Sequence, residues 1–447
     1  MSIEEFKSEL IDTINNTCVE NKVPVKAFIH KIWKINTFDE KLSFTTPEEL
    51  TTAPSISIGD IYLEYCKEHQ NMNTIVQKIL ATFLWYCEND AYEDLSKQNL
   101  TNMQTYIDKI SETGNLIPVL INTKANEKFA RELLEYLKNT AGQQIITGQH
   151  TQTIPCEEIA YIRQTTGKEP KLRGFELLAY SPNINYADAS PECLTEVEEN
   201  KGTAETALQW ARANRPDKVN DTGTENSTDY TTGGILTFSF HWFSPLGGRD
   251  KSFYTEHTDF DAAKILQEGT PERAAFYHDM DVIAGILQQF QQEHIPILWR
   301  PFHESYGTWF WWGAKGAKVA RDLYRLMFDY YTGEKNLHNL LWVWNCDIEE
   351  AYPGDEYVDV VSIDVYLPEY QSTDYADAYE KLVAATSRDK VAALAEVGYL
   401  PDVELLQKSR IPWAYYMTWS KEFCIGEKYN RVENLKKMYD SEYAVTL

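Results

Sequence analysis

Hydrophobic and polar positions alternate regularly from about residue 140 to the end of the chain. Short runs of β-branched and aromatic residues, typical of buried strands, alternate with longer segments in which apolar positions recur at the helical period. The strands we expect are 144–148, 172–180, 235–242, 295–303, 340–345, 360–366, 392–397 and 413–419. The helices we expect between them are 157–166, 204–214, 272–294, 316–331, 374–386, 402–408 and 431–441.

Eight strands with intervening helices over about 300 residues predict an α/β fold of the (β/α)8 barrel type, which we place at residues 110–447. The alternative is a doubly wound open sheet. That fold commonly carries a GxGxxG pattern after its first strand, and no such pattern follows residues 144–148.

The first part of the chain follows a different pattern. Residues 2–16 have the apolar spacing of an amphipathic helix, 25–29 alternate as a strand does, and 72–89 are again helical in pattern. We therefore expect a small α+β domain of unknown role at residues 1–92, either a structural appendage or a partner-binding module.

Residues 181–232 form a long polar segment rich in Asn, Asp and Thr, with one expected helix inside it. Loops of this length after a barrel strand commonly shape the substrate cleft, and this one is long enough to close one end of it. The alternative is a disordered insertion.

Composition narrows the class of ligand. The chain has 42 basic and 68 acidic residues, a formal charge of −26, which argues against nucleic acid and anionic membranes as partners. An acidic surface suits an uncharged polymer, although it could also serve solubility alone. Seven scattered cysteines without a CxxC pair predict neither a disulfide framework nor a zinc site, and we expect no cofactor and no metal.

The most informative segment is residues 297–313, which begins as a buried strand and then places His303 and Glu304 among Trp299, Trp309 and two further tryptophans. In (β/α)8 barrels the chemistry lies at the carboxyl ends of the strands. A second glutamate, Glu396, ends the seventh expected strand. Glycoside hydrolysis needs such a pair, and a separation of about 5–5.5 Å would indicate retention of configuration.

Several of these motifs resemble glycoside hydrolase family 26, which includes many β-mannanases. The resemblance covers about residues 140–447 and is strongest in the Trp-Arg-Pro-Phe-His-Glu sequence of 299–304 with the Trp-Phe-Trp-Trp-Gly of 309–313. It extends to 147–149, 172–176, 238–242, 362–366 and 395–398.

The resemblance implies a role for each matching position. Glu304 matches the general acid/base and Glu396 the nucleophile, which a hydrogen bond from Tyr366 would keep at a low pKa. The positions that match substrate contacts, or that lie beside them, are His241, Trp242, His303, Trp309, Asp364, Tyr366 and Trp419. Trp311 and Trp312 are expected to pack the loop rather than line the cleft.

The expected function is retaining hydrolysis of β-1,4-mannosidic linkages in mannan or manno-oligosaccharides by a monomeric enzyme. Mixed-linkage β-glucan and β-1,3-xylan remain alternative substrates, as does a carbohydrate-binding barrel without catalysis. The first residues have neither a basic region nor an apolar run. As written the chain is therefore expected to be cytoplasmic, although the family is often secreted, and the localisation stays open.

Overall fold

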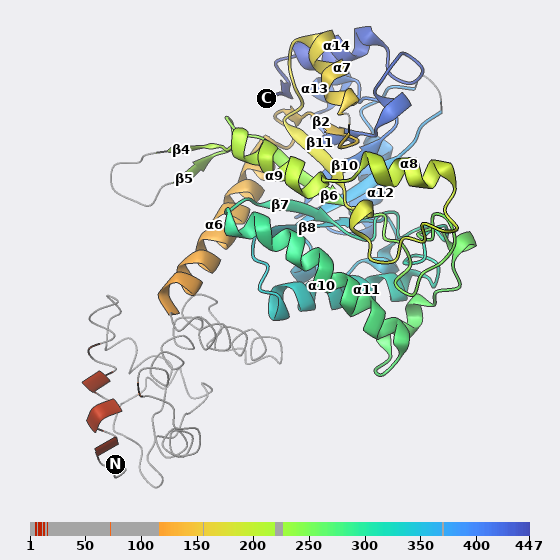
Figure 1. Ribbon diagram of the computed structural model, residues 1–447. Helices are drawn as coiled ribbons and strands as arrows, with labels where there is room; N and C mark the ends of the chain where they lie inside the picture. Colours follow the sequence, from red (N-terminus) through yellow and green to blue (C-terminus); the bar gives the residue numbers. More distant parts are fainter. Residues whose placement is uncertain are drawn as a thin grey trace. The chain divides into compact units, whose positions relative to one another are not determined.

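The computed structural model describes residues 116–447 except 155, 220–226 and 369–370, together with residues 5, 6, 8–10, 12, 13, 16 and 72. Residues 126–328 and 337–447 form one compact unit. The α+β domain expected at 1–92, and its boundary with the barrel, lie outside the described residues. The helix α6 (Leu116–Thr140) leads into the compact unit, which contains all the strands discussed below (Figure 1).

Parallel strands form a closed ring. Neighbouring strands pair in the order β2, β3, β6, β7, β8, β9, β10 and β11, and β11 pairs with β2 to close it. Their bounds are β1 Ile145–Ile146, β2 Gly148–His150, β3 Leu172–Glu176, β6 Ile235–Ser239, β7 Ile297–Arg300, β8 Leu340–Asn345, β9 Val360–Val365, β10 Val391–Val397, β11 Trp413–Thr418 and β12 Ala444–Val445. The strand β1 also pairs with β11 and continues into β2, so β1 and β2 count as one interrupted strand. The ring therefore has eight members, and the expected (β/α)8 barrel is confirmed.

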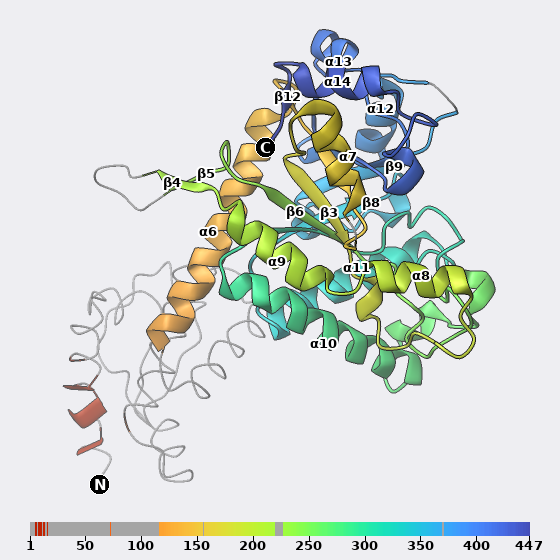
Figure 2. The same cartoon turned by 45° about the horizontal axis from the view of Figure 1, so that its top comes forward.

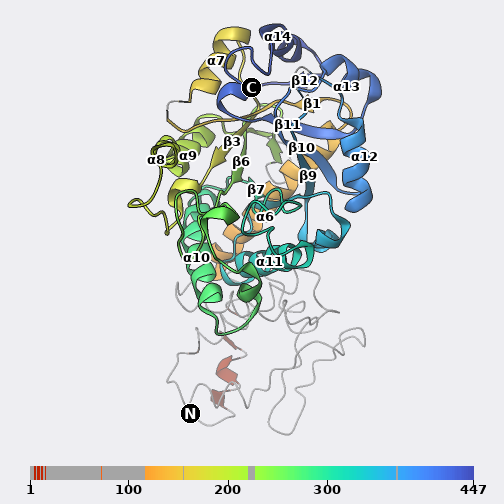
Figure 3. The ribbon, with the colours of Figure 1, turned by 90° about the vertical axis from the view of Figure 1, so that its right-hand side faces the viewer.

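Helices surround the ring on its outside (Figure 3). They are α7 Glu157–Thr166, α8 Pro191–Glu199, α9 Thr203–Ala213, α10 Pro271–Gln292, α11 Ala317–Asp329, α12 Ala376–Ala385, α13 Val403–Ser409 and α14 Val432–Asp440. Figure 2 shows α9 beside β3 and β6, with which it packs. Among the described residues, none of the helices has the length and apolarity needed to cross a membrane.

The strands are apolar along their whole length because both faces are covered. Every residue of β8 (Leu-Leu-Trp-Val-Trp-Asn) and of β10 (Val-Ala-Ala-Leu-Ala-Glu-Val) is buried. Helices cover the outer face of such a sheet and side chains fill the inside, so continuous hydrophobic runs replace the alternation of a half-exposed strand.

The first barrel strand is broken at Thr147. Its hydroxyl donates to the carbonyl of Val445 at 2.8 Å, which joins this strand to the C-terminal strand β12. At Gly148 a Cβ would lie 2.3 Å from the carbonyl oxygen of Tyr416. Only glycine permits so close an approach of β11, and pairing then resumes as far as His150.

Three expected strands are too long. The structure ends β3 at Glu176, β6 at Ser239 and β7 at Arg300. A short 3₁₀ turn, Leu178–Tyr180, follows β3. After β7, Phe302 and Glu304 both take a left-handed φ of 53°, which no strand accommodates. Residues 241–242 therefore lie beyond the end of β6, and residues 303–304 lie in a turn rather than in a strand.

The polar segment 181–232 has more structure than expected. It contains two helices, α8 and α9, and the antiparallel pair β4 Asp217–Val219 with β5 Ser227–Asp229. The expectation of a single helix is wrong, and so is a disordered insertion for α8 and α9. Ser190 caps α8 by accepting from the Cys193 amide, and Pro191 occupies the first turn. This Ser-Pro start is a recognisable helix signal.

Candidate active site

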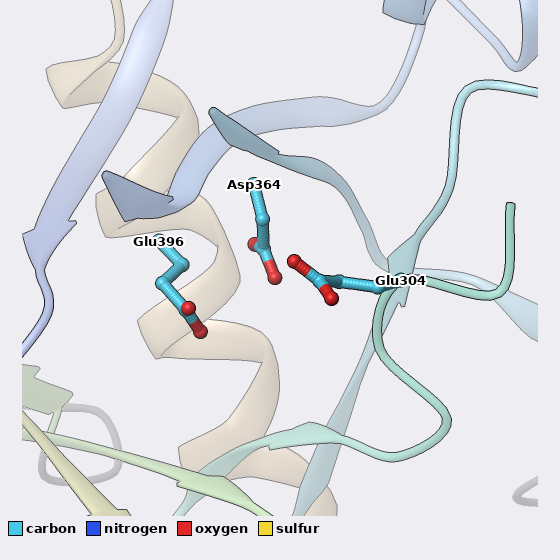
Figure 4. A group of neighbouring side chains, drawn as sticks. All are labelled: Glu304, Asp364 and Glu396. Atoms are coloured by element: carbon cyan, nitrogen blue, oxygen red, sulfur yellow. The ribbon is translucent and has the colours of Figure 1, made fainter. Parts of the chain in front are cut away.

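Three carboxyl groups meet at the carboxyl ends of neighbouring strands. Asp364 lies in β9, Glu396 in β10, and Glu304 in the turn that follows β7. Their side chains point toward one another (Figure 4), and one oxygen from each lies within 4.8 Å of the others. Such closeness matches the carboxyl pairs of retaining glycosidases, whereas inverting enzymes keep about 6.5–9.5 Å between theirs.

The turn that carries Glu304 has a strained backbone. Phe302 and Glu304 adopt left-handed conformations that cost a residue with a Cβ about 1–3 kcal/mol each. Hydrogen bonds hold the turn in place. The Glu304 amide donates to Asn345 Oδ1 at 2.8 Å, and Trp312 Nε1 donates to the His303 carbonyl at 2.8 Å. The strain serves to aim the Glu304 side chain at the other two carboxyl groups.

Two aromatic side chains donate to the Glu304 carboxyl group. Trp309 Nε1 donates to Oε2 at 2.8 Å, and the Tyr306 hydroxyl lies 3.4 Å from Oε1. Burial raises the pKa of Glu304, and the charge of Asp364 raises it further, against the opposing effect of the Trp309 hydrogen bond. A raised pKa is what a general acid needs near neutral pH.

Trp309 reaches Glu304 because residue 307 has no side chain. A Cβ on Gly307 would lie 2.3 Å from the Trp309 ring, far inside van der Waals contact. The indole therefore folds back over the Gly307 backbone, where its N–H meets the carboxyl group five residues before it in the sequence.

Glu396 is held at both oxygens. Arg300 Nη2 donates to Oε2 at 2.9 Å, and the Tyr366 hydroxyl donates to Oε1. The expectation that this carboxyl has a low pKa is wrong. Burial raises the pKa of Glu396, as does the charge of Glu304, and Arg300 and Tyr366 only partly oppose them. Arg300 cannot compensate fully because its charge is shared.

Asp364 accepts a hydrogen bond from the other terminal nitrogen of Arg300. Arg300 Nη1 donates to Oδ2 at 2.7 Å, and Asn345 Nδ2 donates to Oδ1 at 2.7 Å. The Asp364 side chain has no exposed surface. Burial raises the pKa of Asp364 to about 7, since the opposing charge of Arg300 is partly cancelled by Glu396. Because it is buried, Asp364 can reach a ligand only through its neighbours, and a direct substrate contact is not supported.

A second cluster lies on the opposite side of the barrel mouth, on β3 and β6. Glu176 Oε2 receives the Ser239 hydroxyl and His241 Nδ1, each at 2.8 Å, and Oε1 receives the backbone amides of His241 at 2.8 Å and Leu178 at 3.0 Å. Burial alone would raise the pKa of Glu176, but the charge and hydrogen bonds of His241 outweigh it and lower that pKa to about 2.

His241 connects this cluster to the turn after β7. Its Nε2 lies 3.2 Å from Nε2 of His303. The interaction with Glu176 outweighs burial and raises the pKa of His241, whereas burial and the neighbouring charge of His241 lower the pKa of His303. His303 is 1% exposed, so a direct contact of His303 with a substrate is not supported, whereas His241 is only part-buried.

Trp419, just after β11, is part-buried and stacks on His150 with ring centroids 3.9 Å apart and planes at 25°. Burial lowers the pKa of His150 to about 3, so the ring is neutral. A neutral imidazole under the indole fixes its plane without adding charge, and the part-exposed Trp419 remains the expected platform for a sugar ring.

The tryptophans near Glu304 fall into two groups. Trp309 is 41% exposed and stays a candidate for substrate contact. The other three of the segment, Trp299, Trp311 and Trp312, are at most 1% exposed, so they are core residues. Burial of Trp311 and Trp312 agrees with the expectation that they pack the loop, and of these four tryptophans only Trp309 is exposed enough to contact a substrate.

The expectation that Trp242 contacts the substrate is not supported. Trp242 is 2% exposed, it donates through Nε1 to Asp279 Oδ2 at 2.8 Å, and it stacks on Phe276. The ring is enclosed by the inner side of α10, and no face of it is open to a substrate. The strand-end rule failed here because β6 already stops at Ser239, three residues before Trp242.

The carboxyl oxygens of Glu304, Asp364 and Glu396 are close enough together to offer ligands to a metal ion. Arg300 already supplies positive charge to two of these carboxyl groups. An ion-pair network is therefore sufficient to explain why the three groups lie so close.

Sequence reasoning did not single out Arg300, Asn345 or Glu176. A signal for Asn345 was present in the sequence, because Asn345 ends an expected strand as directly as Glu396 does. Glu176 was hidden by extending its strand to residue 180. Arg300 stands inside the motif of 299–304 but was not assigned a partner.

A profile of glycosyl hydrolase family 26 matches residues 202–447. A mannan endo-1,4-beta-mannosidase of Thermothelomyces thermophilus is 33% identical over 335 residues, which are 73% of this chain and 62% of that protein. This chain thus spans less than two thirds of the relative's length.

Two solved structures share the fold. The GH26-CBM35 beta-(1,4)-mannanase of Podospora anserina superposes with a TM-score of 0.60 at 33% identity, covering 71% of this chain and 66% of that one. A beta-mannanase from a symbiotic protist of the termite Reticulitermes speratus, complexed with a gluco-manno-oligosaccharide, gives a TM-score of 0.59 at 28% identity and covers 71% and 93%. The match of the family profile to more than half of the sequence establishes that the chain belongs to glycosyl hydrolase family 26.

Proposed function

We propose that this chain is a retaining glycoside hydrolase that cleaves β-1,4-mannosidic linkages in mannan or manno-oligosaccharides. The observation that carries the proposal is the approach of the Glu304 and Glu396 carboxyl oxygens to within 4.8 Å. That spacing leaves room for a sugar carbon between a nucleophile and an acid but not for an attacking water on the far face. The relatives with mannanase names support mannan as the substrate.

In the first step Glu396 attacks the anomeric carbon while Glu304 protonates the glycosidic oxygen. The bond to the leaving sugar breaks, and an ester between Glu396 and the sugar forms. Arg300 and Tyr366 occupy one lone pair on each Glu396 oxygen, which fixes the direction of attack.

In the second step Glu304, now ionised, takes a proton from water, and the resulting hydroxide equivalent attacks the same anomeric carbon. The ester breaks, Glu396 leaves as a carboxylate, and the configuration is retained overall. The Trp309 indole N–H stabilises the ionised form of Glu304 in this step. His241 and Trp419 remain the proposed contacts of the bound sugar.

The test compares wild type with Glu396→Ala and Glu304→Ala on mannan, glucomannan, lichenan and β-1,3-xylan. Wild type should favour the mannan substrates, and loss of either glutamate should lower kcat by about 10⁴-fold or more. Glu380→Ala, which removes a 63% exposed carboxylate on α12, is the matched control and should change nothing. Cleavage of none of the four polymers would reject a hydrolase, and a preference for lichenan or xylan would reject mannan.

An aryl β-mannobioside, whose leaving group needs no protonation, distinguishes the roles of Glu304 and Glu396. Glu304→Ala should form the ester from this substrate nearly as fast as wild type and then stall, giving a burst of product. Glu396→Ala should give no burst. The reverse pattern would exchange the two roles.

A further inference from the structure

Asn345, at the carboxyl end of β8, is completely buried and has every polar atom of its side chain engaged. Its Oδ1 accepts the backbone amide of Glu304 at 2.8 Å. Its Nδ2 donates to Asp364 Oδ1 at 2.7 Å and to Ser362 Oγ at 3.1 Å. One side chain therefore connects the backbone of the proposed acid to the carboxyl group that shares Arg300 with the proposed nucleophile.

The orientation of this amide is dictated by its partners. A backbone N–H can only donate, so the atom facing Glu304 must be the oxygen. The nitrogen then faces Asp364 and Ser362. The Ser362 hydroxyl donates its own hydrogen to the Trp344 carbonyl at 3.0 Å, so it accepts from Asn345. No other side chain of this size supplies an acceptor on one side and two hydrogens on the other.

The position of the acceptor matters because Glu304 is strained. Its left-handed φ of 53° is sustained only while surrounding contacts compensate for it. The hydrogen bond to Asn345 acts directly on the Glu304 amide, in contrast to the bonds of Trp309 and Tyr306, which act on the carboxyl group.

We propose that Asn345 is a positioning residue that holds the acid/base turn in its left-handed conformation and fixes its distance from the Asp364–Arg300–Glu396 network. The inference rests on the proposed function and extends it to a residue that touches neither sugar nor reacting atoms. Both halves of the catalytic apparatus are tied to the end of one strand, β8.

The sharpest variant is Asn345→Asp, because it exchanges two hydrogens for one titratable proton. With a proton on the oxygen that faces Asp364, the new side chain still donates to Asp364 and still accepts from Glu304. Without it, two buried carboxylates stand at hydrogen-bond distance. The charged and titratable groups around them are Arg300 on β7, Glu304 and Tyr306 after it, Asp364 on β9, Tyr366 just after it, Glu396 on β10 and Tyr415 on β11.

Asn345→Asp should keep within about tenfold of wild-type kcat at acidic pH and lose activity as pH rises, because repulsion between the two carboxylates disrupts the connection from β8 to Asp364. This loss of geometry outweighs the rise in the pKa of Glu304 that the added charge brings, so the basic limb of kcat moves to lower pH. Its melting temperature should fall in the same direction, since a buried acid with a raised pKa contributes stability that is lost as pH rises. KM should change little, because Asn345 does not touch the sugar.

Asn339 provides the matched control. It lies at the other end of β8, it is 1% exposed, and it donates to the Ile295 carbonyl at 2.9 Å far from any carboxyl group of the site. Asn339→Asp should lower the melting temperature without moving the pH profile of kcat. Asn345→Leu, which has neither donor nor acceptor, should lose about 100-fold or more in kcat at every pH.

The experiment is a pH profile of kcat, KM and melting temperature from about pH 4 to pH 9, which brackets the expected limbs, for wild type, Asn345→Asp, Asn345→Leu and Asn339→Asp. A basic limb that moves down in Asn345→Asp alone supports the inference. A profile parallel to wild type, or the same shift in Asn339→Asp, overturns it. If Asn345→Leu does not fold, the comparison of the two Asp variants decides. A wild type without glycosidase activity would instead reject the proposed function.

Discussion

Two buried carboxylate clusters lie at the mouth of the same barrel, and their proton affinities are opposite. On β3, Glu176 accepts two backbone amides, a hydroxyl and an imidazole, and its pKa falls to about 2. On β9 and β10, Asp364 and Glu396 share one guanidinium with Glu304 close by, and the pKa of Asp364 rises to about 7.

Burial is similar in the two clusters, so burial does not explain the difference. What differs is the number of donors per carboxyl group. Glu176 accepts from four donors, whereas three carboxyl groups crowd around Arg300 in the other cluster. The first arrangement produces a permanent anion that holds His241. The second produces groups that can take up and release protons near neutral pH, as acid–base chemistry requires.

The largest expected effect comes from removing one charge from the crowded cluster. In Asp364→Asn the new amide nitrogen faces either Arg300 Nη1 or Asn345 Nδ2, so a donor meets a donor in both orientations, and kcat/KM should fall by about 10²–10³-fold. The charge of Asp364 raises the pKa of Glu304. Its loss should therefore move the basic limb of kcat/KM to lower pH, and a basic limb that stayed in place would show that the carboxyl groups are not coupled.

A smaller effect is expected when the donor-rich cluster is broken. Glu176→Gln places an NH₂ opposite His241 Nδ1 or Ser239, and kcat/KM should fall by about 10–100-fold. Glu176 has a folded pKa of about 2, below its ordinary value of 4.5. Its stabilising contribution is present above pH 4.5 and is lost as pH falls toward 2.

Melting temperatures between neutral pH and about pH 2 measure that loss. Wild type should lose stability steeply below pH 4.5, the ordinary pKa of the group, and Glu176→Gln should start lower but lose less over the same range. If melting temperature fell equally with pH in the two proteins, Glu176 would not be a carboxylate with a lowered pKa.

The smallest effect concerns one hydrogen bond at the edge of the crowded cluster. Trp309→Phe keeps a ring over Gly307 but removes the N–H that lowers the pKa of Glu304. The basic limb of kcat/KM should therefore move to higher pH, opposite to Asp364→Asn, with a loss of several-fold in kcat. Shifts of the same sign in both variants would contradict the assignment of donors and charges to Glu304.

The sequence predicted the barrel, because strands covered on both faces leave continuous apolar runs separated by helix-period segments. It also predicted that Glu304 and Glu396 lie close together, since parallel strands must bring their carboxyl ends together. The pattern of residue types does not encode the left-handed turn at 302–304. That turn depends on contacts such as the Glu304 amide with Asn345, which is 41 residues further along the chain.

For the same reason the sequence predicted the pKa of Glu396 wrongly. Tyr366 is a donor to it, as expected, but the sign of the shift depends on how Arg300 is divided between Asp364 and Glu396. Trp242 was predicted to contact the substrate because the expected strand extended to residue 242, whereas β6 ends at Ser239. The division of the Arg300 charge and the position at which β6 ends both depend on tertiary contacts, and a sequence motif does not specify these contacts.

The proposed mechanism depends most on Glu304 and Glu396 acting as a closely spaced retaining pair. Proton NMR of the anomeric signals during hydrolysis of mannopentaose by wild type tests this directly. The β-anomer of the new reducing end should form first and the α-anomer should follow by mutarotation. If the α-anomer formed first, hydrolysis would be inverting, and the roles proposed for Glu396, Arg300 and Tyr366 would be wrong.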